Sequence, residues 1–356
     1  MPLVAHNDLP AFERLRREGH TILPPEKARS QDIRELHIGL LNMMPDAALA
    51  ATERQFFRLI GVSNPIAQFY VHPFTLPQLP RGESAREHIA RYYESFEQLR
   101  AQGLDALIVT GANVTGPNLS EQPFWKPLTE VIDWAAGAVT STLCSCLATH
   151  AVLEYRYGQK RVPQPRKIWG VYPHRVVSHH PLVVAVNTCF DVPHSRWNAI
   201  LRSQFDAAGL PVLVESENAG VHLATSEDGF RFVFFQGHPE YDTVSLLKEY
   251  KREVLRHAHG QRDDYPEFPR AYLRPREQAI LNEYRLRLLA ARERGENAPE
   301  FPEPLVAERL DNTWRDTAEA IVGDWIGLVY QITNSDRNKP FMDGIDPRDP
   351  LGLRDA

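Results

Sequence analysis

Short apolar runs alternate with helix-like segments through the first 157 residues of this 356-residue chain. The strand candidates are LHIGLLNMM (36–44), IAQFYV (66–71), LDALIVTGAN (104–113) and VTSTLCS (139–145). The helix candidates between them are ALAATERQFFRLIG (48–61), SAREHIARYYESFEQLRAQG (84–103) and PLTEVIDWAAG (127–137). In the second of these, Ser84 with Glu87 is typical of a helix start, and Gly103 of a helix end. This alternation predicts an α/β fold, with a parallel-rich sheet flanked by helices.

The pattern changes from about Gly170, where four β-rich runs follow one another without long helices between them. These runs are HPLVVAVN (180–187), PVLVES (211–216), GVHLATS (220–226) and FRFVFFQG (230–237). Helix then resumes in SLLKEYKREVLRHAHG (245–260), and WRDTAEAIVGDWIGLVYQ (314–331) has one apolar stripe, which indicates a packing helix. The charged stretch 274–304 reads as a solvated helix and a Pro-rich linker. We expect one domain over 1–335, with an N-terminal arm (1–34), a charged helical insertion (275–303) and a loosely held polar tail (336–356).

The composition of the chain limits the possible binding partners and the expected cellular compartment. A net charge of −6 and a pI near 6.2 provide no basic surface for nucleic acid or for an anionic membrane. The chain has no apolar run of the roughly 18 residues that a membrane span needs, and its N-terminus does not resemble a secretory signal. The three cysteines are odd in number, and Cys144 and Cys146 are too close to bridge readily within a strand. Free thiols in the cytoplasm are therefore expected.

Cys146 lies where a buried strand turns into a helix, in VTSTLCSCLATHAVL (139–153). Amides at a helix N-terminus favour an anion, and they offer N–H groups for an oxyanion hole. A tight elbow of this kind needs small residues two before and two after the nucleophile, and Cys144 and Ala148 satisfy this. Cys146 is thus the candidate nucleophile; the alternative is that it is a small buried apolar residue.

A candidate base follows the last β-rich run, in FFQGHPEYD (234–242). In an extended segment His238 and Glu240 point the same way, and Pro239 favours that extended geometry. Glu240 can then orient His238, which can act as the base for a thiol. The oxyanion hole needs a second N–H from another strand end, and LIVTGAN (107–113) provides a loop for it. We therefore expect Ala112 and Leu147 to form the hole.

Several stretches of the sequence resemble those of a known protein family. A cysteine elbow with a distant His-x-Glu is similar to the class I glutamine amidotransferase-like (flavodoxin-like) fold. The rest of the chain is identified as a member of the homoserine O-acyltransferases of methionine biosynthesis, usually called homoserine O-succinyltransferases. The stretches that carry the resemblance are LHIGLLNMMP, ERQFFRLI, LDALIVTGAN, VTSTLCSCLA, KIWGVYPH, VPHSRW, GHPEYD, the helix around KREV, and NTWRD with VYQIT.

The resemblance implies roles for individual residues. Cys146 matches the acyl-accepting nucleophile, His238 the general base and Glu240 its partner. Substrate-binding positions match Lys167, Ser195 and Arg252, the last of which suits the α-carboxylate of an amino acid. Without the resemblance, Lys167 and Arg252 would be interpreted as solvated charges and Ser195 as a turn residue. The resemblance further implies succinyl-CoA and L-homoserine as substrates, no other cofactor, no metal, and a homodimer.

The choice of acyl donor depends, by resemblance, on one position in the loop after LIVTGA, which carries Gly in succinyl-using members and Glu in acetyl-using ones. Thr115 stands there, and a neutral side chain favours succinyl-CoA over acetyl-CoA on electrostatic grounds. Many relatives also carry paired lysines after NMMP, where this chain has Asp46 and Ala47. Serine stays open as an alternative acceptor to homoserine.

Two other functions remain as alternatives. A glutamine amidotransferase or related hydrolase would use the same three catalytic residues, but no synthetase-like second domain is evident. A metal-binding or regulatory module is suggested by the histidines at 174, 179, 180 and 194, although they lack the short paired spacing of a zinc site.

Overall fold

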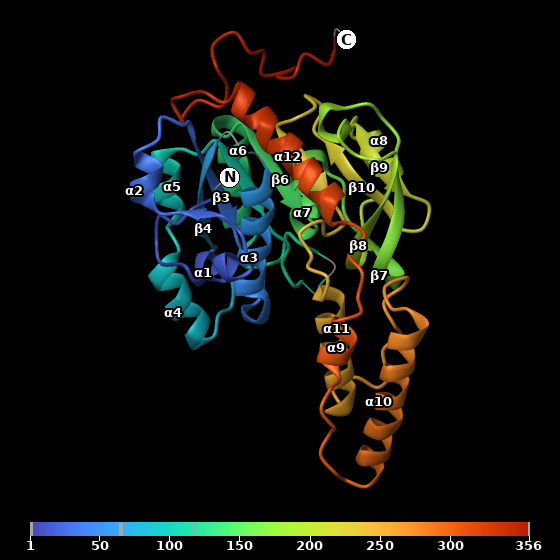
Figure 1. Cartoon of the computed structure of the whole chain (residues 1–356). Helices are drawn as coiled ribbons and strands as arrows, with labels where there is room; N and C mark the ends of the chain where they lie inside the picture. Colours follow the sequence, from blue (N-terminus) through green and yellow to red (C-terminus); the bar gives the residue numbers. More distant parts are fainter. Residues whose placement is uncertain (1–2, 64–66, 115, 117, 355–356) are drawn as a thin grey trace.

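A computed structural model describes residues 3–63, 67–114, 116 and 118–354 (Figure 1). Its centre is one eleven-stranded sheet with the order β2-β1-β4-β3-β5-β6-β11-β10-β9-β7-β8. From β2 to β11 all neighbours pair in parallel, and from β11 to β8 all pair antiparallel. The predicted parallel-rich α/β sheet with an added β-rich segment is confirmed.

The parallel half is built from the alternating segments. Its strands are β1 (Leu3–Val4), β2 (Ile22–Leu23), β3 (Glu35–Leu41), β4 (Gln68–Phe74), β5 (Ala106–Val109), β6 (Ser141–Ser145) and β11 (Phe232–Phe235). Its helices are α1 (Pro10–Arg17), α2 (Pro25–Arg29), α3 (Asp46–Ser63), α4 (Glu83–Tyr92), α5 (Phe96–Gln102), α6 (Trp125–Ala138) and α7 (Leu147–Tyr157). The strands are buried on both faces, which explains their continuous apolar runs.

Helices cover both faces of this sheet, and each face has its own apolar core. One core joins α1, α3 and the C-terminal helix α12 (Arg315–Ile332) to the sheet, with Phe57 and Trp325 fully buried. The other joins α5, α6, α7 and α8 (Arg202–Ala207) to the opposite face, around Leu128 and Phe205. Two faces buried in this way hold the strand ends, and the loops that leave them, in fixed positions.

The antiparallel part differs from the expectation. The strands β9 (Val212–Ser216) and β10 (Gly220–Thr225) were predicted, but HPLVVAVN contains a short 3-10 helix, η1 (Pro181–Val183), and no strand. His180 caps this turn by accepting a hydrogen bond from the Leu182 amide at 3.1 Å. Instead, the long strands β7 (Val162–Val176) and β8 (Cys189–Ala199) form the edge of the sheet. Prolines and charges interrupt their apolar pattern, so sequence periodicity did not reveal them.

The segment 84–103 forms two helices rather than one. The first helix, α4, begins after Gly82, and Ser84 does not cap it. The capping box lies further along: the Gln98 amide donates to the Ser95 hydroxyl at 3.2 Å, and the Ser95 amide donates to the Gln98 side chain at 3.0 Å. The helix α5 therefore begins at Phe96. It ends at Gly103, as predicted, with a positive φ of 74°.

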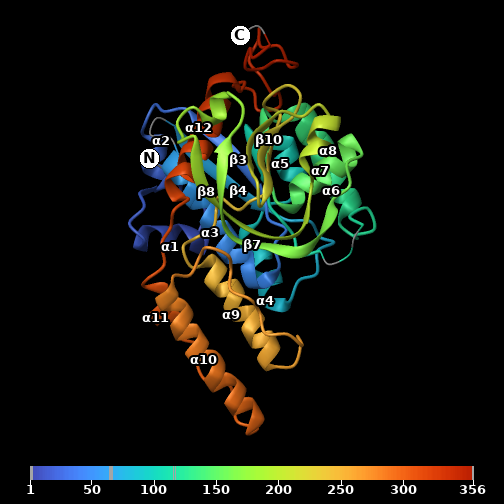
Figure 2. The ribbon, with the colours of Figure 1, turned by 90° about the vertical axis from the view of Figure 1, so that its right-hand side faces the viewer.

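The charged stretch is not merely solvated. With α9 (Ser245–Ala258) and α11 (Glu303–Ala307), α10 (Pro275–Glu293) forms a helical projection from the body, visible in both ribbon views (Figures 1 and 2). The projection has its own core, in which Leu281, Tyr284 and Leu288 pack with residues of α9 and with Phe301. The buried residues of α10 recur every three or four positions, so one face of the helix is buried although charged residues surround it; they are Glu277, Leu281, Tyr284, Leu288 and Ala291.

The C-terminal tail also makes contacts with the body. The Thr140 hydroxyl donates to the Pro340 carbonyl, and the Arg231 guanidinium lies 4.5 Å from the ring centre of Phe341, which is buried. These contacts argue against the loosely held tail that its polarity suggested. Within the described residues, no helix is long and apolar enough to cross a membrane.

Candidate active site

Three neighbouring parallel strands end beside one another and deliver the candidate catalytic residues. Val109 of β5 pairs with Cys144 of β6, and Ser145 of β6 pairs with Phe235 of β11. The chain segments that follow these strands therefore leave from the same carboxyl edge, where α/β sheets bind ligands. They carry Gly111, Cys146 and His238, which came from separate parts of the sequence.

Cys146 occupies a backbone conformation that L-residues rarely adopt, with φ 52° and ψ −105°. Its amide donates to the Phe235 carbonyl at 2.7 Å, and α7 begins at the next residue. The Thr149 hydroxyl lies 2.9 Å from the carbonyl oxygens of both Cys144 and Phe235, and it ties the first turn of α7 to both strands. The elbow predicted from the sequence is thus present, and its strain is held by β6, β11 and α7 together.

The cysteines are as expected: all three are free, with Cys144 buried, Cys146 half-buried and Cys189 exposed. Cys144 fills the strand beneath the elbow, within the core that joins α6 and α7 to the sheet. Among the three thiols, only that of Cys146 is placed beside a histidine that can serve as a base.

His238 and Glu240 form the expected pair. The Nδ1 atom of His238 lies 2.8 Å from Oε1 of Glu240, and both side chains are buried. Burial alone would lower the pKa of His238, but the charges of Glu240 and Cys146 and hydrogen bonds to both raise it well above 6.5. Tyr241 stacks on the imidazole with ring centres 4.4 Å apart. The arrangement favours the protonated imidazole of His238, placed beside the thiol of Cys146 as a Cys–His nucleophile requires.

Two buried arginines of α3 hold the segment that carries this pair. Arg58 donates to the Glu240 carbonyl at 3.1 Å, and both Arg54 and Arg58 form ion pairs with Asp242. Gln55 also donates to Asp242, at 3.3 Å. The motif ERQFFRLI therefore contributes to the site by positioning GHPEYD, a role that the sequence did not reveal.

The loop after β5 approaches the nucleophile as the oxyanion-hole prediction requires. A Cβ atom added at Gly111 would lie 3.7 Å from Cβ of Cys146 and 3.9 Å from the Leu147 nitrogen. The backbone of Gly111 and its neighbour Ala112 thus passes beside the elbow amides. Thr115, expected to discriminate between acyl donors, lies outside the described residues.

Glu249 of α9 gathers the predicted substrate-binding residues, and sequence reasoning missed it. Its Oε2 atom accepts hydrogen bonds from Ser195 at 2.5 Å, from Trp169 at 3.0 Å and from Lys167 at 3.2 Å. Its Oε1 atom accepts from Tyr241 at 2.6 Å, which connects this cluster to His238. Burial would raise the pKa of Glu249, but Lys167 and the hydrogen bonds lower it overall, so the carboxylate is charged. A signal existed: Glu249 lies three residues before Arg252, on the same side of a helix.

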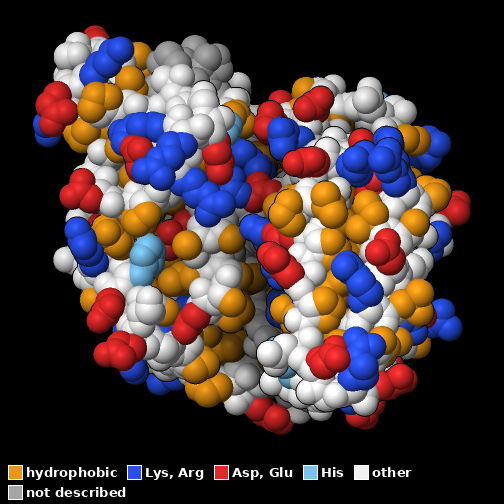
Figure 3. Space-filling model, turned by 60° about the horizontal axis from the view of Figure 1, so that its bottom comes forward, with side chains coloured by type: hydrophobic (Ala, Val, Ile, Leu, Met, Phe, Trp, Pro, Cys, Tyr) orange, Lys and Arg blue, Asp and Glu red, His pale blue; other side chains and the backbone are white. Residues whose placement is uncertain are grey.

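Arg252 does not join this cluster directly. Its side chain is 59% exposed, and its Nε atom lies 3.2 Å from the carboxylate of Glu253. Glu253 is one helical turn beyond Glu249. The positive charge of Arg252 is still close enough to contribute to the lowered pKa of Lys167, which burial chiefly causes. Viewed from below, the surface is hollowed between the body and the projection, and Lys and Arg side chains gather beside this groove (Figure 3).

A buried arginine and several histidines lie behind the elbow. Arg196 donates to Nδ1 of His194 at 2.6 Å, and its charge acts on Cys146. Nε2 of His194 lies 3.1 Å from Nε2 of His174, whose Nδ1 lies 2.8 Å from the Tyr172 carbonyl. Because Nδ1 of His194 accepts from Arg196, its Nε2 carries the proton, and the chain runs from Arg196 to Tyr172 with every imidazole neutral. Burial lowers the pKa of His194 well below 6.5, in keeping with this assignment.

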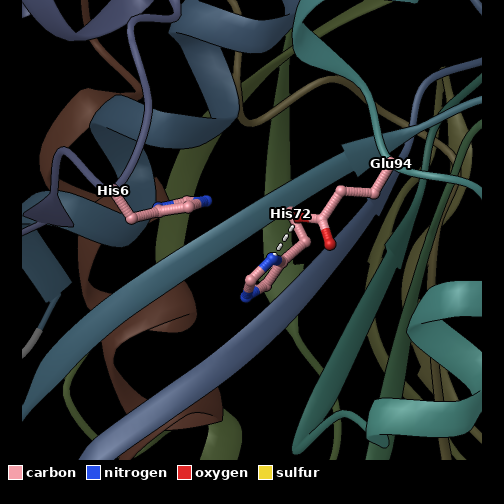
Figure 4. Close-up of side chains that lie close together, drawn as sticks. All are labelled: His6, His72 and Glu94. Carbon is pink, nitrogen blue, oxygen red and sulfur yellow. Dashed lines mark hydrogen bonds and ion pairs between the residues drawn. The ribbon is translucent and has the colours of Figure 1, made fainter.

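A second histidine cluster is the best candidate for a metal centre among the described residues. His6, His72 and Glu94 offer ligand atoms within 4.8 Å of one another (Figure 4). Nδ1 of His72 is already bonded to Glu94 at 2.5 Å, however, and its Nε2 lies 2.9 Å from Nδ1 of His37. Hydrogen bonds thus satisfy both nitrogens of His72, and the cluster links β3 and β4 to the loop before α5. The cluster of His6, His72 and Glu94 shares no residue with the catalytic triad or with the group around Lys167.

The fold and this cluster of side chains define a class: an α/β protein that presents cysteine, histidine and glutamate at the carboxyl edge of a parallel sheet, as cysteine-dependent acyl transfer requires. The family model of homoserine O-succinyltransferase matches residues 2–335, and the chain belongs to that family.

Relatives of the same family match over nearly the whole chain. The homoserine O-succinyltransferase of Allochromatium vinosum is 68% identical and that of Nitrosococcus oceani 67%, each over 99% of both chains. That of Cardiobacterium hominis is 50% identical over 99% of both chains. Among solved structures, a glutamine amidotransferase from Thermotoga maritima is 12% identical, with a TM-score of 0.44 over 83% of this chain and 97% of its own. Family membership therefore comes from the sequence relatives.

The raised pKa of His238 predicts a pH dependence of stability. The imidazolium is favoured in the folded state, so its contribution is complete below the unfolded pKa of about 6.5 and is lost as pH rises through the higher folded pKa. We expect urea unfolding to show that the wild type loses stability as pH rises above about 7. Glu240→Gln should reduce that loss because it removes a charge that raises this pKa. An equal loss in both proteins would contradict the assigned ion pair.

Buried neutral histidines predict instability in acid. Burial lowers the pKa of His6, His174 and His180 to about 4, and that of His37 and His150 to about 3. The unfolded chain binds protons near pH 6.5 and the folded chain does not, so stability is lost as pH falls below about 6.5. Several such groups act together, so we expect the protein to unfold cooperatively between about pH 6 and pH 4. Far-UV circular dichroism measures this unfolding. Calorimetry should show uptake of more than one proton, and uptake of none would contradict the assignment.

Proposed function

We propose that this enzyme transfers a succinyl group from succinyl-CoA to the side-chain hydroxyl of L-homoserine, through a thioester on Cys146. The product, O-succinyl-L-homoserine, is an intermediate of methionine biosynthesis. The observation that carries the proposal is the contact of Cys146 with His238, which is itself oriented by Glu240, in a chain that belongs to the homoserine O-succinyltransferase family. Cytoplasmic location and a homodimer are part of the same proposal.

The first half-reaction acylates the enzyme. The Cys146 thiolate attacks the thioester carbonyl of succinyl-CoA, and the negative charge that develops on its oxygen meets the amides near Ala112 and Leu147. The tetrahedral intermediate collapses, the bond to the CoA sulfur breaks, and the His238 imidazolium donates its proton to the departing thiolate. One thioester replaces another, so this step is close to neutral in energy.

The second half-reaction consumes the thioester. Neutral His238 takes the proton of the homoserine hydroxyl, whose oxygen attacks the acyl carbonyl and releases the Cys146 thiolate. Homoserine carries an ammonium and a carboxylate, and the site carries matching groups. Glu249 suits the ammonium, whereas Lys167 and Arg252 suit the carboxylate. The Ser195 hydroxyl, bonded to Glu249, lies in the same acceptor site.

The test separates the two half-reactions. The enzyme is mixed with succinyl-CoA without an acceptor, and release of CoA is followed together with the intact protein mass. We expect a stoichiometric burst of CoA and a succinyl mass increment, which homoserine then discharges to O-succinyl-homoserine. An acetyl adduct from acetyl-CoA alone would reassign the donor, and discharge by serine but not by homoserine would reassign the acceptor. Hydrolysis of glutamine without any adduct would move the protein to the amidotransferases.

A further inference from the structure

Tyr241 connects two parts of the site that come from different regions of the fold. Its ring stacks on the imidazole of His238, with ring centres 4.4 Å apart and ring planes inclined by 19°. Its hydroxyl donates a hydrogen bond to Oε1 of Glu249 at 2.6 Å. His238 follows β11 in the body, whereas Glu249 lies on α9 in the projection. One side chain therefore contacts both the candidate base and the carboxylate that is proposed to bind the acceptor ammonium.

Both the backbone and the hydroxyl of Tyr241 are held in place. Nε1 of Trp314 donates to the Tyr241 carbonyl at 2.9 Å, and the Tyr241 amide donates to the His238 carbonyl at 3.2 Å. Burial and the charge of Glu249 raise the pKa of Tyr241 well above 10, so the hydroxyl keeps its proton and acts as a donor. Its bond goes to Oε1 of Glu249, whereas the Ser195 hydroxyl bonds to Oε2. Tyr241 thus orients one oxygen of this carboxylate from the segment that carries the base.

The two candidate acceptors differ in the spacing between their ammonium and hydroxyl groups. By ordinary bond lengths, the nitrogen and the hydroxyl oxygen are about 5 Å apart in extended homoserine and at most about 3.7 Å apart in serine. The acceptor hydroxyl must reach the base while the ammonium reaches its carboxylate, because only then is the bound acceptor aligned for proton transfer. A fixed separation between base and carboxylate therefore favours one of the two acceptors.

We propose that Tyr241 is a positioning residue that fixes the separation between His238 and Glu249 and so selects homoserine over serine. This inference rests on the proposed function. The ring holds the imidazole in place, and its face favours the protonated form that donates to the departing CoA thiolate. The hydroxyl holds the carboxylate for the acceptor ammonium. An aromatic ring and a hydrogen bond stand between base and carboxylate, so the separation that they impose suits the longer acceptor.

Other neighbours of Glu249 reach it from the edge strands of the sheet. Trp169 and Lys167 on β7 bond to Oε2 at 3.0 Å and 3.2 Å, and Ser195 on β8 bonds to the same oxygen at 2.5 Å. These three side chains place the carboxylate relative to β7 and β8. Tyr241 places it relative to His238, so a change at Tyr241 alters the alignment of acceptor and base.

The test compares homoserine with serine in Tyr241→Phe, which keeps the ring and removes the hydroxyl. Acylation by succinyl-CoA, measured as the CoA burst, should stay within about threefold of the wild type because the stack on His238 remains. We expect kcat/KM for discharge of the acyl-enzyme to fall by about 10- to 100-fold with homoserine and by less than about threefold with serine. Tyr241→Leu removes the ring as well, and it should slow acylation by about tenfold.

Two further variants supply the controls. Tyr284→Phe removes a hydroxyl that donates to the Pro299 carbonyl at 3.1 Å on the projection, and it should change none of these rates. If Tyr241 acts through Glu249, adding Tyr241→Phe to Glu249→Gln should slow homoserine transfer by less than about threefold beyond Glu249→Gln alone. A full multiplication of the two single effects would mean that the two residues act separately.

The outcomes separate this proposal from the proposed function. Equal losses with homoserine and serine in Tyr241→Phe, or an unchanged homoserine rate, would overturn the proposal. A loss of acylation as large as the loss of transfer would overturn it too, as would a wild type that uses both acceptors equally well. In each case the wild-type CoA burst and the succinyl adduct would still establish the thioester mechanism. A normal burst in Tyr241→Phe shows that the variant is folded, so a loss limited to homoserine transfer can be attributed to the missing hydroxyl.

Discussion

Cys146→Ala is expected to abolish both the succinyl adduct and the formation of O-succinyl-homoserine, with kcat reduced by at least about 10⁴-fold. The physical reason is that no other thiol can take its place: Cys144 is buried in the strand, and Cys189 is exposed at the start of β8. Burial raises the pKa of the Cys144 thiol above the usual range, so it does not supply a thiolate at neutral pH.

Intact-protein mass spectrometry with succinyl-CoA checks this result directly. Cys189→Ala is the matched control, since it removes an exposed thiol and should leave the adduct and the rate unchanged. Circular dichroism should show that Cys146→Ala is folded, because the smaller side chain fits the elbow. A succinyl adduct on the Cys146→Ala protein would contradict the assignment of the nucleophile.

Glu249→Gln is expected to separate the two half-reactions. The change keeps the shape of the side chain and removes the charge that Lys167, Ser195 and Trp169 contact. We expect acylation by succinyl-CoA to stay within about threefold of the wild type. By contrast, kcat/KM for homoserine should fall by about 10²- to 10³-fold, because the ammonium loses a buried anionic partner. Stopped-flow measurement of the CoA burst and of acyl discharge gives the two numbers separately.

Glu303→Gln supplies the control for this prediction. Glu303 pairs with Lys251 at 2.6 Å on the projection, so its loss removes a carboxylate that contacts the same helix α9 outside the site. Homoserine transfer should be unaffected in that variant. If Glu249→Gln slowed acylation as much as transfer, Glu249 would act on the triad through Tyr241 rather than on the acceptor.

Local signals in the sequence were sufficient for the parts of the site that lie close together along the chain. Cys146 was recognisable because a buried strand, small flanking residues and a helix start occur within ten residues. His238 and Glu240 were recognisable because two residues in an extended segment face the same way. The family resemblance added Lys167, Ser195 and Arg252, of which the structure brings the first two together at Glu249.

Contacts between distant segments were not encoded in any local pattern. Glu249 became visible as the centre of the proposed acceptor site only when β7, β8 and α9 were placed together, because its partners on β7 and β8 lie 54 to 82 positions away. The support of GHPEYD by Arg54 and Arg58 joins residues more than 180 positions apart, and in sequence these arginines look like ordinary helix charges.

The sequence by itself determined the α/β class, the elbow and the candidate triad, because strand–helix periodicity and tight turns depend on neighbours along the chain. The tertiary structure alone decided the long edge strands β7 and β8, the apolar core of the charged projection and the meeting of Lys167 and Ser195 at Glu249. Charged and proline-rich segments can bury one face when a partner surface is present, and hydrophobic periodicity does not reveal that partner. The site therefore combines locally encoded catalytic residues with a binding shell that exists only in the folded chain.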